Sequence, residues 1–182
     1  MTRSPRVEIR QKLQESRRYT LQLVNAIDAE TAAHRPRPDA WSIKDHVAHL
    51  VAVEESVIHF AHRILDEDCP ISPLCHDVAF NQDVWNNREV AERTGYTWTE
   101  ARCALDATRQ ELLALLDHIP PQALDRLGSH PVWGTPVTLS SVLRVPYRHE
   151  RGHRDEIAAL YAMSIESHHE SVAHRQYPSG NT

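Results

Sequence analysis

The stretch WSIKDHVAHL, residues 41–50, marks the start of a long helix. Ser42 and Asp45 have the spacing of a capping box, in which each side chain bonds to the backbone N–H of the other residue. Apolar residues then recur three and four positions apart as far as about Leu65, and this period is typical of a helix with one buried face. The sequence therefore predicts an amphipathic helix from Ile43 to about Leu65.

Helical patterns also cover most of the chain on either side of this segment. The same apolar period predicts long helices at about residues 5–30, 97–118 and 139–162, and a shorter helical piece at 78–93. Thr97 and Glu100 have the spacing of a second capping box, at the start of the helix predicted at 97–118. Pro146 lies inside the last of these, so we expect a bend there. With only 6% aromatic residues and five glycines, the composition disfavours a sheet-rich fold. We expect an all-α fold, a four-helix bundle.

The connections between the predicted helices differ in length. Residues 66–77 form a loop with two prolines, and residues 127–138 form a link rich in glycine and proline, in which only the last two residues are expected to be extended. Long links on both sides of the third main helix allow neighbours in the bundle that are not consecutive in sequence. We expect one bundle domain, residues 1–163, followed by a polar and flexible tail, residues 164–182.

Charge and composition narrow the classes of function. The net charge is -5 and no basic stretch dominates, so we expect no nucleic-acid partner. No apolar run reaches about 18 residues, and the N-terminus lacks the apolar stretch of a signal peptide, so we expect no membrane association. The three cysteines are scattered and form no CxxC pair, which favours a reducing compartment. These features predict a cytoplasmic protein.

Thirteen histidines are the unusual feature of the composition. His149 and His153, in HERGHRDE, are four residues apart, so on a helix they lie on one face and can bind a single metal ion. Apolar residues share that face, and both rings should point into the bundle. A chain with so many histidines contains this spacing about once by chance, and two core histidines bonded to carboxylates or backbone explain it equally well. The residues alone leave both interpretations open.

A third metal ligand would have to come from another helix, and the helix that begins at Ile43 offers His46, His49, His59 and His62. His46 falls within the apolar arc of that helix and His49 falls only at its edge, so the spacing favours His46. Glu54 also falls within the arc, either as the third ligand or as a group that orients the ligands. Three protein ligands leave open positions for water or substrate, as in catalytic metal sites.

The segment WSIKDHVAHL resembles the signature of the DinB/YfiT superfamily, in which a tryptophan precedes the second helix and a histidine follows eight residues later. Trp41 and His49 match this signature. The other two metal ligands of the family form H-x3-H on the last helix and match His149 and His153. The resemblance covers about residues 7–162, and it favours His49 as the third ligand over the alternative that apolar spacing prefers.

The resemblance implies a DinB-like antiparallel four-helix bundle, often a homodimer, with zinc, nickel, iron or manganese on the three histidines. Characterised branches of the family include transferases and isomerases that use low-molecular-weight thiols such as mycothiol or bacillithiol. The sulfoxide synthases of ergothioneine formation carry the same domain, with H-x3-H-x-E on the last helix. Here Asp155 stands at the acidic position and Glu156 follows it, so the chain departs from that branch.

The histidines and the resemblance together lead to one preferred function and two alternatives. The preferred function is a metal-dependent enzyme that acts on a small molecule at a divalent metal site formed by His49, His149 and His153. Its reaction would be that of a thiol-dependent transferase or isomerase, or of a hydrolase. The first alternative is a non-catalytic, stress-linked binding protein whose metal site is structural and closed by Glu54 or Glu150. The second is a helical dimer without metal, in which the histidines are polar groups of the core.

Overall fold

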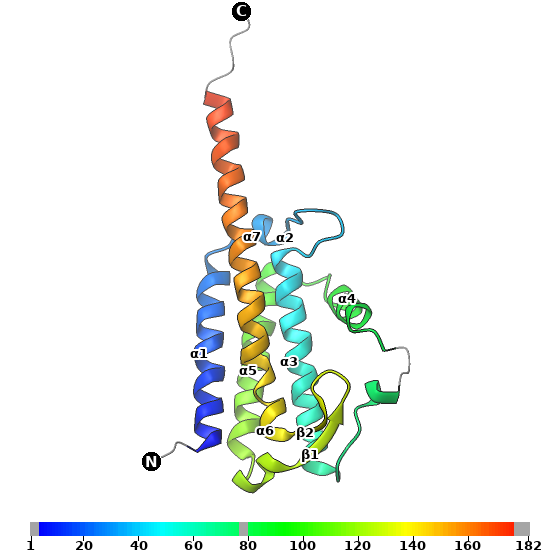
Figure 1. The fold of residues 1–182 in the computed structure, drawn as a ribbon. Helices are drawn as coiled ribbons and strands as arrows, with labels where there is room; N and C mark the ends of the chain where they lie inside the picture. The colour runs from blue at the N-terminus through cyan, green and yellow to red at the C-terminus, as the bar shows by residue number, and fades with distance from the viewer. Residues whose placement is uncertain (1–3, 77–79, 177–182) are drawn as a thin grey trace, which may run out of the picture.

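The computed structural model describes residues 4–76 and 80–176 and is built mainly of four long helices (Figure 1). The long helices are α1 (Pro5–Asn25), α3 (Ile43–Asp66), α5 (Trp98–His118) and α7 (Val145–Gln176). The shorter elements are the helices α2 (Ala29–Ala33), η1 (Pro73–His76), α4 (Gln82–Glu92), η2 (Pro121–Asp125) and α6 (Leu139–Val142) and the strands β1 (Leu127–His130) and β2 (Gly134–Thr138). The predicted all-α four-helix bundle is confirmed.

The long helices are not packed in sequence order. Helix α3 packs against α5 and α7, and α1 packs against the same two helices. Helices α1 and α7 run in one direction, and α3 and α5 run in the opposite direction (Figure 1). The bundle therefore has two antiparallel neighbour pairs, α1–α5 and α3–α7, and two parallel pairs. A parallel pair needs a long return connection, and for α3 and α5 it is provided by residues 67–97, within which α4 packs on α3. The helical piece predicted at 78–93 corresponds to α4, and its predicted first residues lie outside the described part of the chain.

Both predicted capping boxes are formed. The backbone N–H of Ser42 donates to Asp45 Oδ2 at 2.9 Å, and the N–H of Asp45 donates to Ser42 Oγ at 3.2 Å. Thr97 and Glu100 repeat this exchange at 2.7 and 3.2 Å. These reciprocal bonds satisfy N–H groups that have no partner within a helix, and so they fix the first residues of α3 and α5.

The first predicted helix, residues 5–30, is divided in the structure. Helix α1 ends at Asn25, and the separate helix α2 begins at Ala29. Asp28 is the N-cap of α2: its backbone is extended, and its side chain accepts a hydrogen bond from the N–H of Thr31 at 2.9 Å. Apolar spacing continues across this cap, which is why the spacing alone predicted a single helix.

The link at residues 127–138 is more regular than predicted. It forms an antiparallel hairpin of β1 and β2, with irregular pairing between Gly128 and His130. Gly128 lies tightly against α3, since a Cβ atom at this position would be 2.9 Å from Phe60 Cζ and 3.0 Å from Ile64 Cγ1. The hairpin lies near the end of the bundle where α3 and α5 finish (Figure 1).

The last predicted helix, residues 139–162, differs from the structure in two respects. It is interrupted between α6 and α7, and Pro146 lies in the first turn of α7. Proline is compatible with a first turn, because the N–H that it lacks has no partner there. Helix α7 then continues to Gln176, so the predicted tail is helical up to that residue, and residues 177–182 lie outside the described residues.

The core of the bundle consists of two apolar clusters. One includes Leu13, Val57, Leu112 and Leu143, and the other includes Val24, Leu50, Leu105 and Ile157. Between the two clusters each long helix contributes one buried charged residue, in chain order Arg17, Glu54, Arg109 and Glu150. We call these four residues the charge layer.

Candidate metal centre

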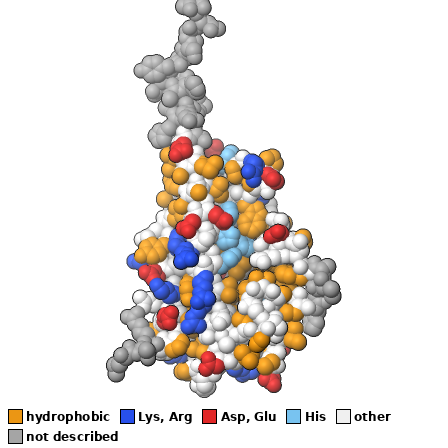
Figure 2. Space-filling view, viewed as in Figure 1, with side chains coloured by type: hydrophobic (Ala, Val, Ile, Leu, Met, Phe, Trp, Pro, Cys, Tyr) orange, Lys and Arg blue, Asp and Glu red, His pale blue; other side chains and the backbone are white. Residues whose placement is uncertain are grey.

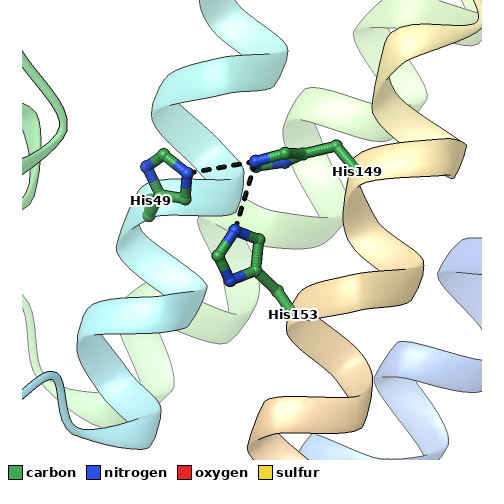
Figure 3. Close-up of side chains that lie close together, drawn as sticks. All are labelled: His49, His149 and His153. Carbon is green, nitrogen blue, oxygen red and sulfur yellow. Dashed lines mark hydrogen bonds between the residues drawn. The ribbon is translucent and has the colours of Figure 1, made fainter. Parts of the chain in front are cut away.

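Histidine side chains reach the surface near the middle of the face shown in Figure 2. His49 from α3 and His149 and His153 from α7 lie close together (Figure 3). His149 Nε2 lies 3.2 Å from His49 Nε2 and 3.1 Å from His153 Nε2. His49 is only 2% exposed, and the other two rings are half-buried. The structure thus brings together the three histidines that the sequence singled out, while their role as metal ligands stays a prediction.

The spacing of these nitrogens suits a divalent metal ion. Two imidazole nitrogens that are each about 2.0–2.1 Å from a tetrahedral ion lie about 3.4 Å apart. Burial, together with the neighbouring histidines, lowers the pKa of His49 to about 3 and that of His149 to about 4. Burial also lowers the pKa of His153. The three imidazoles are therefore neutral near pH 7, and each has a lone pair to offer.

The three-histidine cluster does not satisfy its own hydrogen bonds. A neutral imidazole carries one N–H and one lone pair. His149 Nε2 faces two other Nε2 atoms and can donate to only one of them. His49 Nδ1 is buried and has no hydrogen-bond partner among the described residues. A cation placed among three lone pairs removes the mismatch between the Nε2 atoms, so this donor set suits a metal ion better than a set of core hydrogen bonds.

Glu156 and His46 contact the Nδ1 edge of the His153 ring, on the side away from the Nε2 atom that faces His149. Glu156 Oε2 is 2.7 Å from His153 Nδ1 and 3.3 Å from His46 Nδ1. A carboxylate at Nδ1 favours the tautomer with its proton on that nitrogen, which leaves the Nε2 lone pair of His153 facing the cluster. His46 Nδ1 is 3.1 Å from His153 Nδ1. His46, which apolar spacing favoured as a ligand, therefore contacts the Nδ1 edge of His153 and belongs to a second group with Glu156.

Trp41 lies beside the histidines. Its ring centroid is 4.9 Å from that of His49, 5.4 Å from that of His46 and 6.3 Å from that of His153. Its indole N–H donates to Asn87 Oδ1, on α4, at 3.0 Å. Trp41 therefore connects the site to α4 and forms an apolar wall next to the rings.

The charge layer consists of groups that bind one another. Arg17 and Arg109 each contact both Glu54 and Glu150, and the distance from Arg109 Nη2 to Glu150 Oε2 is 3.0 Å. The contact of Arg17 Nε with Glu150 Oε1, at 2.9 Å, is an ion pair whose angle does not suit a hydrogen bond. Each of the four side chains is at most 4% exposed. The two glutamates that were candidates for a further metal ligand are thus directed to arginine.

The two arginines of the charge layer keep Glu150 ionised. Burial by itself raises the pKa of Glu150, but the guanidinium groups of Arg17 and Arg109 outweigh burial and hold the pKa below its ordinary value. The two arginines also donate to backbone carbonyls, Arg17 to Leu105 and Arg109 to Leu13. Sequence reasoning missed both arginines, although each lies four residues after a leucine of the apolar period, a position at which a charge is unusual.

A family model for the DinB superfamily matches residues 12–157 of the chain. The chain belongs to the DinB superfamily. Its structure is similar to that of YfiT from Bacillus subtilis, which is described as a probable metal-dependent hydrolase with an unusual four-helix bundle topology. The TM-score is 0.71, and the match covers 90% of each chain at 19% sequence identity. At this identity the likeness establishes the DinB fold and leaves the activity to be inferred from the site.

The colibactin self-resistance protein ClbS, solved in complex with a double-stranded DNA, is a second structural match. Its TM-score is 0.66 at 15% identity, over 87% of this chain and 98% of ClbS. At this identity the likeness concerns the fold, and our expectation of no nucleic-acid partner is not confirmed. No curated protein sequence matches the chain significantly. Within the described residues, no helix is long and apolar enough to cross a membrane.

Proposed function

We propose that this DinB-superfamily protein is a metal-dependent enzyme that acts on a small molecule. One divalent ion per chain is bound by His49, His149 and His153. The reaction is a thiol-dependent transfer or isomerisation, or a hydrolysis, since all three can proceed at a metal ion with an exchangeable ligand. The description of YfiT as a probable metal-dependent hydrolase supports this class of activity for the shared fold.

The proposal rests mainly on one contrast. Nitrogen atoms of three imidazoles face one another, whereas the nearby carboxylates are already bound to arginine. A structural metal site is closed by a fourth protein ligand, whereas a catalytic site keeps a position for water or substrate. Glu54 and Glu150 are paired with arginine, and among the described residues the metal-ligand group around His149 contains only histidines. The site therefore has the composition of an open centre, which disfavours a purely structural metal.

The histidines, Glu156 and Trp41 each have a different role at the proposed metal ion. When bound, the ion supplies a Lewis acid that lowers the pKa of a water or thiol ligand. The three neutral imidazoles bind the ion without protons to displace near pH 7. Glu156 holds the Nδ1 proton of His153, and the ring of Trp41 excludes water from one side of the cluster.

The finer parts of the proposal concern the metal, the substrate and the assembly. Imidazole ligands suit zinc and nickel, which we favour, and iron or manganese are the alternatives. A low-molecular-weight thiol is the proposed co-substrate. The resemblance to DinB proteins further leads us to propose a homodimer located in the cytoplasm.

Metal content is the first test. The protein is purified without a nickel-affinity step, and bound metal is measured by mass spectrometry. The wild type should carry about one ion per chain, and His49→Ala, His149→Ala and His153→Ala should each lose it. His62→Ala, which removes an exposed histidine from the same helix α3, should retain it. Full retention of metal in His153→Ala would rule out the proposed site.

Visible spectroscopy of the cobalt-substituted protein tests whether the site is open. A small thiol or azide should change the spectrum if a position exchanges, because cobalt spectra report coordination directly. An unchanged spectrum at saturating ligand, together with loss of metal in Glu54→Gln or Glu150→Gln, would instead indicate a closed structural site. A spectral response should then be followed by a screen of thiol co-substrates with candidate electrophiles and esters.

A further inference from the structure

A groove of about 580 Å³ runs along the surface between α1 and α7. It is lined from α1 by Lys12, Glu15, Ser16 and Tyr19, and from α7 by Tyr147, Arg148, Arg151 and Arg154. The metal centre, by contrast, lies between α7 and α3, and none of its histidines lines the groove. The groove and the metal centre therefore use different faces of α7.

The groove concentrates positive charge in a protein whose net charge is -5. Lys12 is 3.5 Å from Glu15, an exposed pair. Arg148, Arg151 and Arg154 form no ion pair with any carboxylate in the described ranges. Figure 2 shows several Lys and Arg side chains on this face, over α1 and α7, with Asp and Glu side chains among them. The three arginines thus place unneutralised positive charge along one edge of the groove.

The two tyrosines of the groove help to position the arginines. The guanidinium of Arg154 lies 5.7 Å from the ring centroid of Tyr19, and that of Arg148 lies 5.9 Å from the ring centroid of Tyr147. Such contacts hold a guanidinium over an aromatic face without neutralising its charge. Among the described residues no hydrogen bond occupies the N–H groups of these two arginines, so the groove is partly organised for an anion before any ligand binds.

The three arginines lie three residues apart on one helix. At a rise of about 1.5 Å per residue, their Cα atoms are spaced about 4.5 Å apart along the axis of α7. Three cations at this spacing repel one another, and a ligand with several adjacent anionic groups removes the repulsion. Arginine binds phosphate through two parallel hydrogen bonds, and a single carboxylate would neutralise only one of the three.

We propose that the groove is a binding site for a ligand that carries several adjacent phosphate groups. The same chemistry can come from a free polyphosphate or nucleotide, or from the backbone of a nucleic acid. In either case Arg148, Arg151 and Arg154 contact the phosphates, and Lys12 contributes from the opposite wall. The site operates independently of the metal centre.

Two probes distinguish the sources of phosphate. Binding of tripolyphosphate is measured by calorimetry, and binding of a labelled random-sequence duplex DNA is measured by fluorescence anisotropy at several salt concentrations. Both are measured on the metal-free His49→Ala protein as well, because tripolyphosphate can coordinate a metal ion. Equal affinity in wild type and His49→Ala is expected, and it separates this site from the metal centre.

The decisive variant is Arg148→Gln/Arg151→Gln. Its affinity for whichever probe the wild type binds should be at least about tenfold lower. The matched control is Arg37→Gln/Arg88→Gln, which removes two arginines that are exposed and paired with carboxylates elsewhere. It should change affinity less than about twofold. If DNA is the ligand, the slope of log K against log salt should also become shallower by about 0.9 for each phosphate that the variant no longer binds.

The binding results of the two probes identify the source of the phosphate groups. Tripolyphosphate binding without DNA binding assigns the groove to a free phosphorylated ligand, and DNA binding with the expected loss in the variant assigns it to a nucleic-acid backbone. The proposal is overturned if neither probe binds at low salt, or if the control variant weakens binding as much as the groove variant. Equal thermal melting of both variants shows that any difference arises from the groove.

Discussion

The charge layer and the three-histidine cluster are neighbours in the same bundle, and Glu150 directly follows His149 in the chain. In the charge layer, every charge lies within ion-pair distance of two opposite charges. In the histidine cluster, nitrogens of the same kind face one another, and His49 Nδ1 has no partner among the described residues. The charge layer is complete, whereas the histidine cluster is left with unsatisfied nitrogens among the residues that the structure describes.

This difference shows how to distinguish structure from function among buried polar residues. A complete ion-pair network joins α1, α3, α5 and α7 and can fix how the four helices are aligned, which is a structural role. An incomplete cluster costs stability in the absence of a ligand, and such a cost is common at sites that bind one. Both groups lie at positions where the sequence is otherwise apolar, so position alone does not separate them.

The largest expected effect comes from breaking the charge layer. Glu54→Ala removes the carboxylate shared by Arg17 and Arg109 and should lower the free energy of unfolding by about 3–5 kcal/mol, because two buried cations lose a partner. Urea denaturation measures this loss. Glu55→Ala, next in sequence, removes an exposed partner of Arg93 and should cost at most about 1 kcal/mol. Equal losses in the two variants would contradict the role of the layer.

The histidine cluster should instead gain stability from a metal ion. Zinc at about 100 times its dissociation constant should raise the free energy of unfolding by about 2.7 kcal/mol, and a chelator should reverse the gain. His149→Ala should be insensitive to zinc, whereas His62→Ala should respond like the wild type. The measurement is urea denaturation with and without zinc. A zinc response in His149→Ala would place the ion elsewhere.

Glu156 should affect the metal centre without being needed for the fold. Glu156→Gln weakens the acceptor at His153 Nδ1 and should lower zinc affinity about 10–100-fold, as loss of such partners does in other sites. Competition with a chromophoric chelator gives the affinity. Asp155→Asn changes the preceding exposed carboxylate and should leave zinc affinity unchanged. An unaltered affinity in Glu156→Gln would show that the His153 tautomer is set in another way.

The two polar groups should respond to acid in different pH ranges. The pKa of His49 is lowered to about 3 and those of His46 and His149 to about 4, so below the ordinary histidine pKa of 6.5 the unfolded chain binds protons that the folded chain does not. Stability of the metal-free protein should therefore fall between pH 6.5 and 4, by at most about 1.4 kcal/mol per pH unit for each histidine.

The contribution of Glu150 should persist through most of that range, down to about pH 4.5. Its pKa is lowered, so its stabilising effect is present above the ordinary value of 4.5 and is lost only as the pH falls further. Urea denaturation at a series of pH values tests both statements. His46→Gln should reduce the slope between pH 6.5 and 4, and an unchanged slope would show that His46 does not contribute to it.

The smallest effect on stability is expected at the end of α7, far from the charge layer and the histidine cluster. The hydroxyl of Tyr161, near the point where the predicted domain ends, donates to the Ala26 carbonyl at 3.2 Å. The chain after Met163 has few large apolar residues, so deleting it should leave the melting temperature nearly unchanged. A large decrease would mean that this segment packs on the core, on a partner chain or over the site.

Much of the fold could be predicted from local signals in the sequence. Paired capping residues placed the starts of α3 and α5 correctly, because such caps act within one turn of the chain. The same local reasoning failed at two positions. At Asp28, where one continuous helix was predicted, a cap begins the separate helix α2. At Pro146, where a bend within a helix was predicted, the proline lies in the first turn of α7. The hairpin at residues 127–138 was missed because its stability depends on contact with α3, which lies far away in the sequence.

The candidate site divides in a similar way. The sequence by itself determined which histidines share a helix face, and its resemblance to DinB proteins selected His49 over His46. Only the tertiary structure decided that His46 lies at the Nδ1 edge of His153, and that Glu54 and Glu150 bind arginines rather than face the histidines. Periodicity specifies the direction of a side chain from its own helix. The atoms that it meets depend on how α1, α3, α5 and α7 are packed, and that packing is set by contacts between distant parts of the chain.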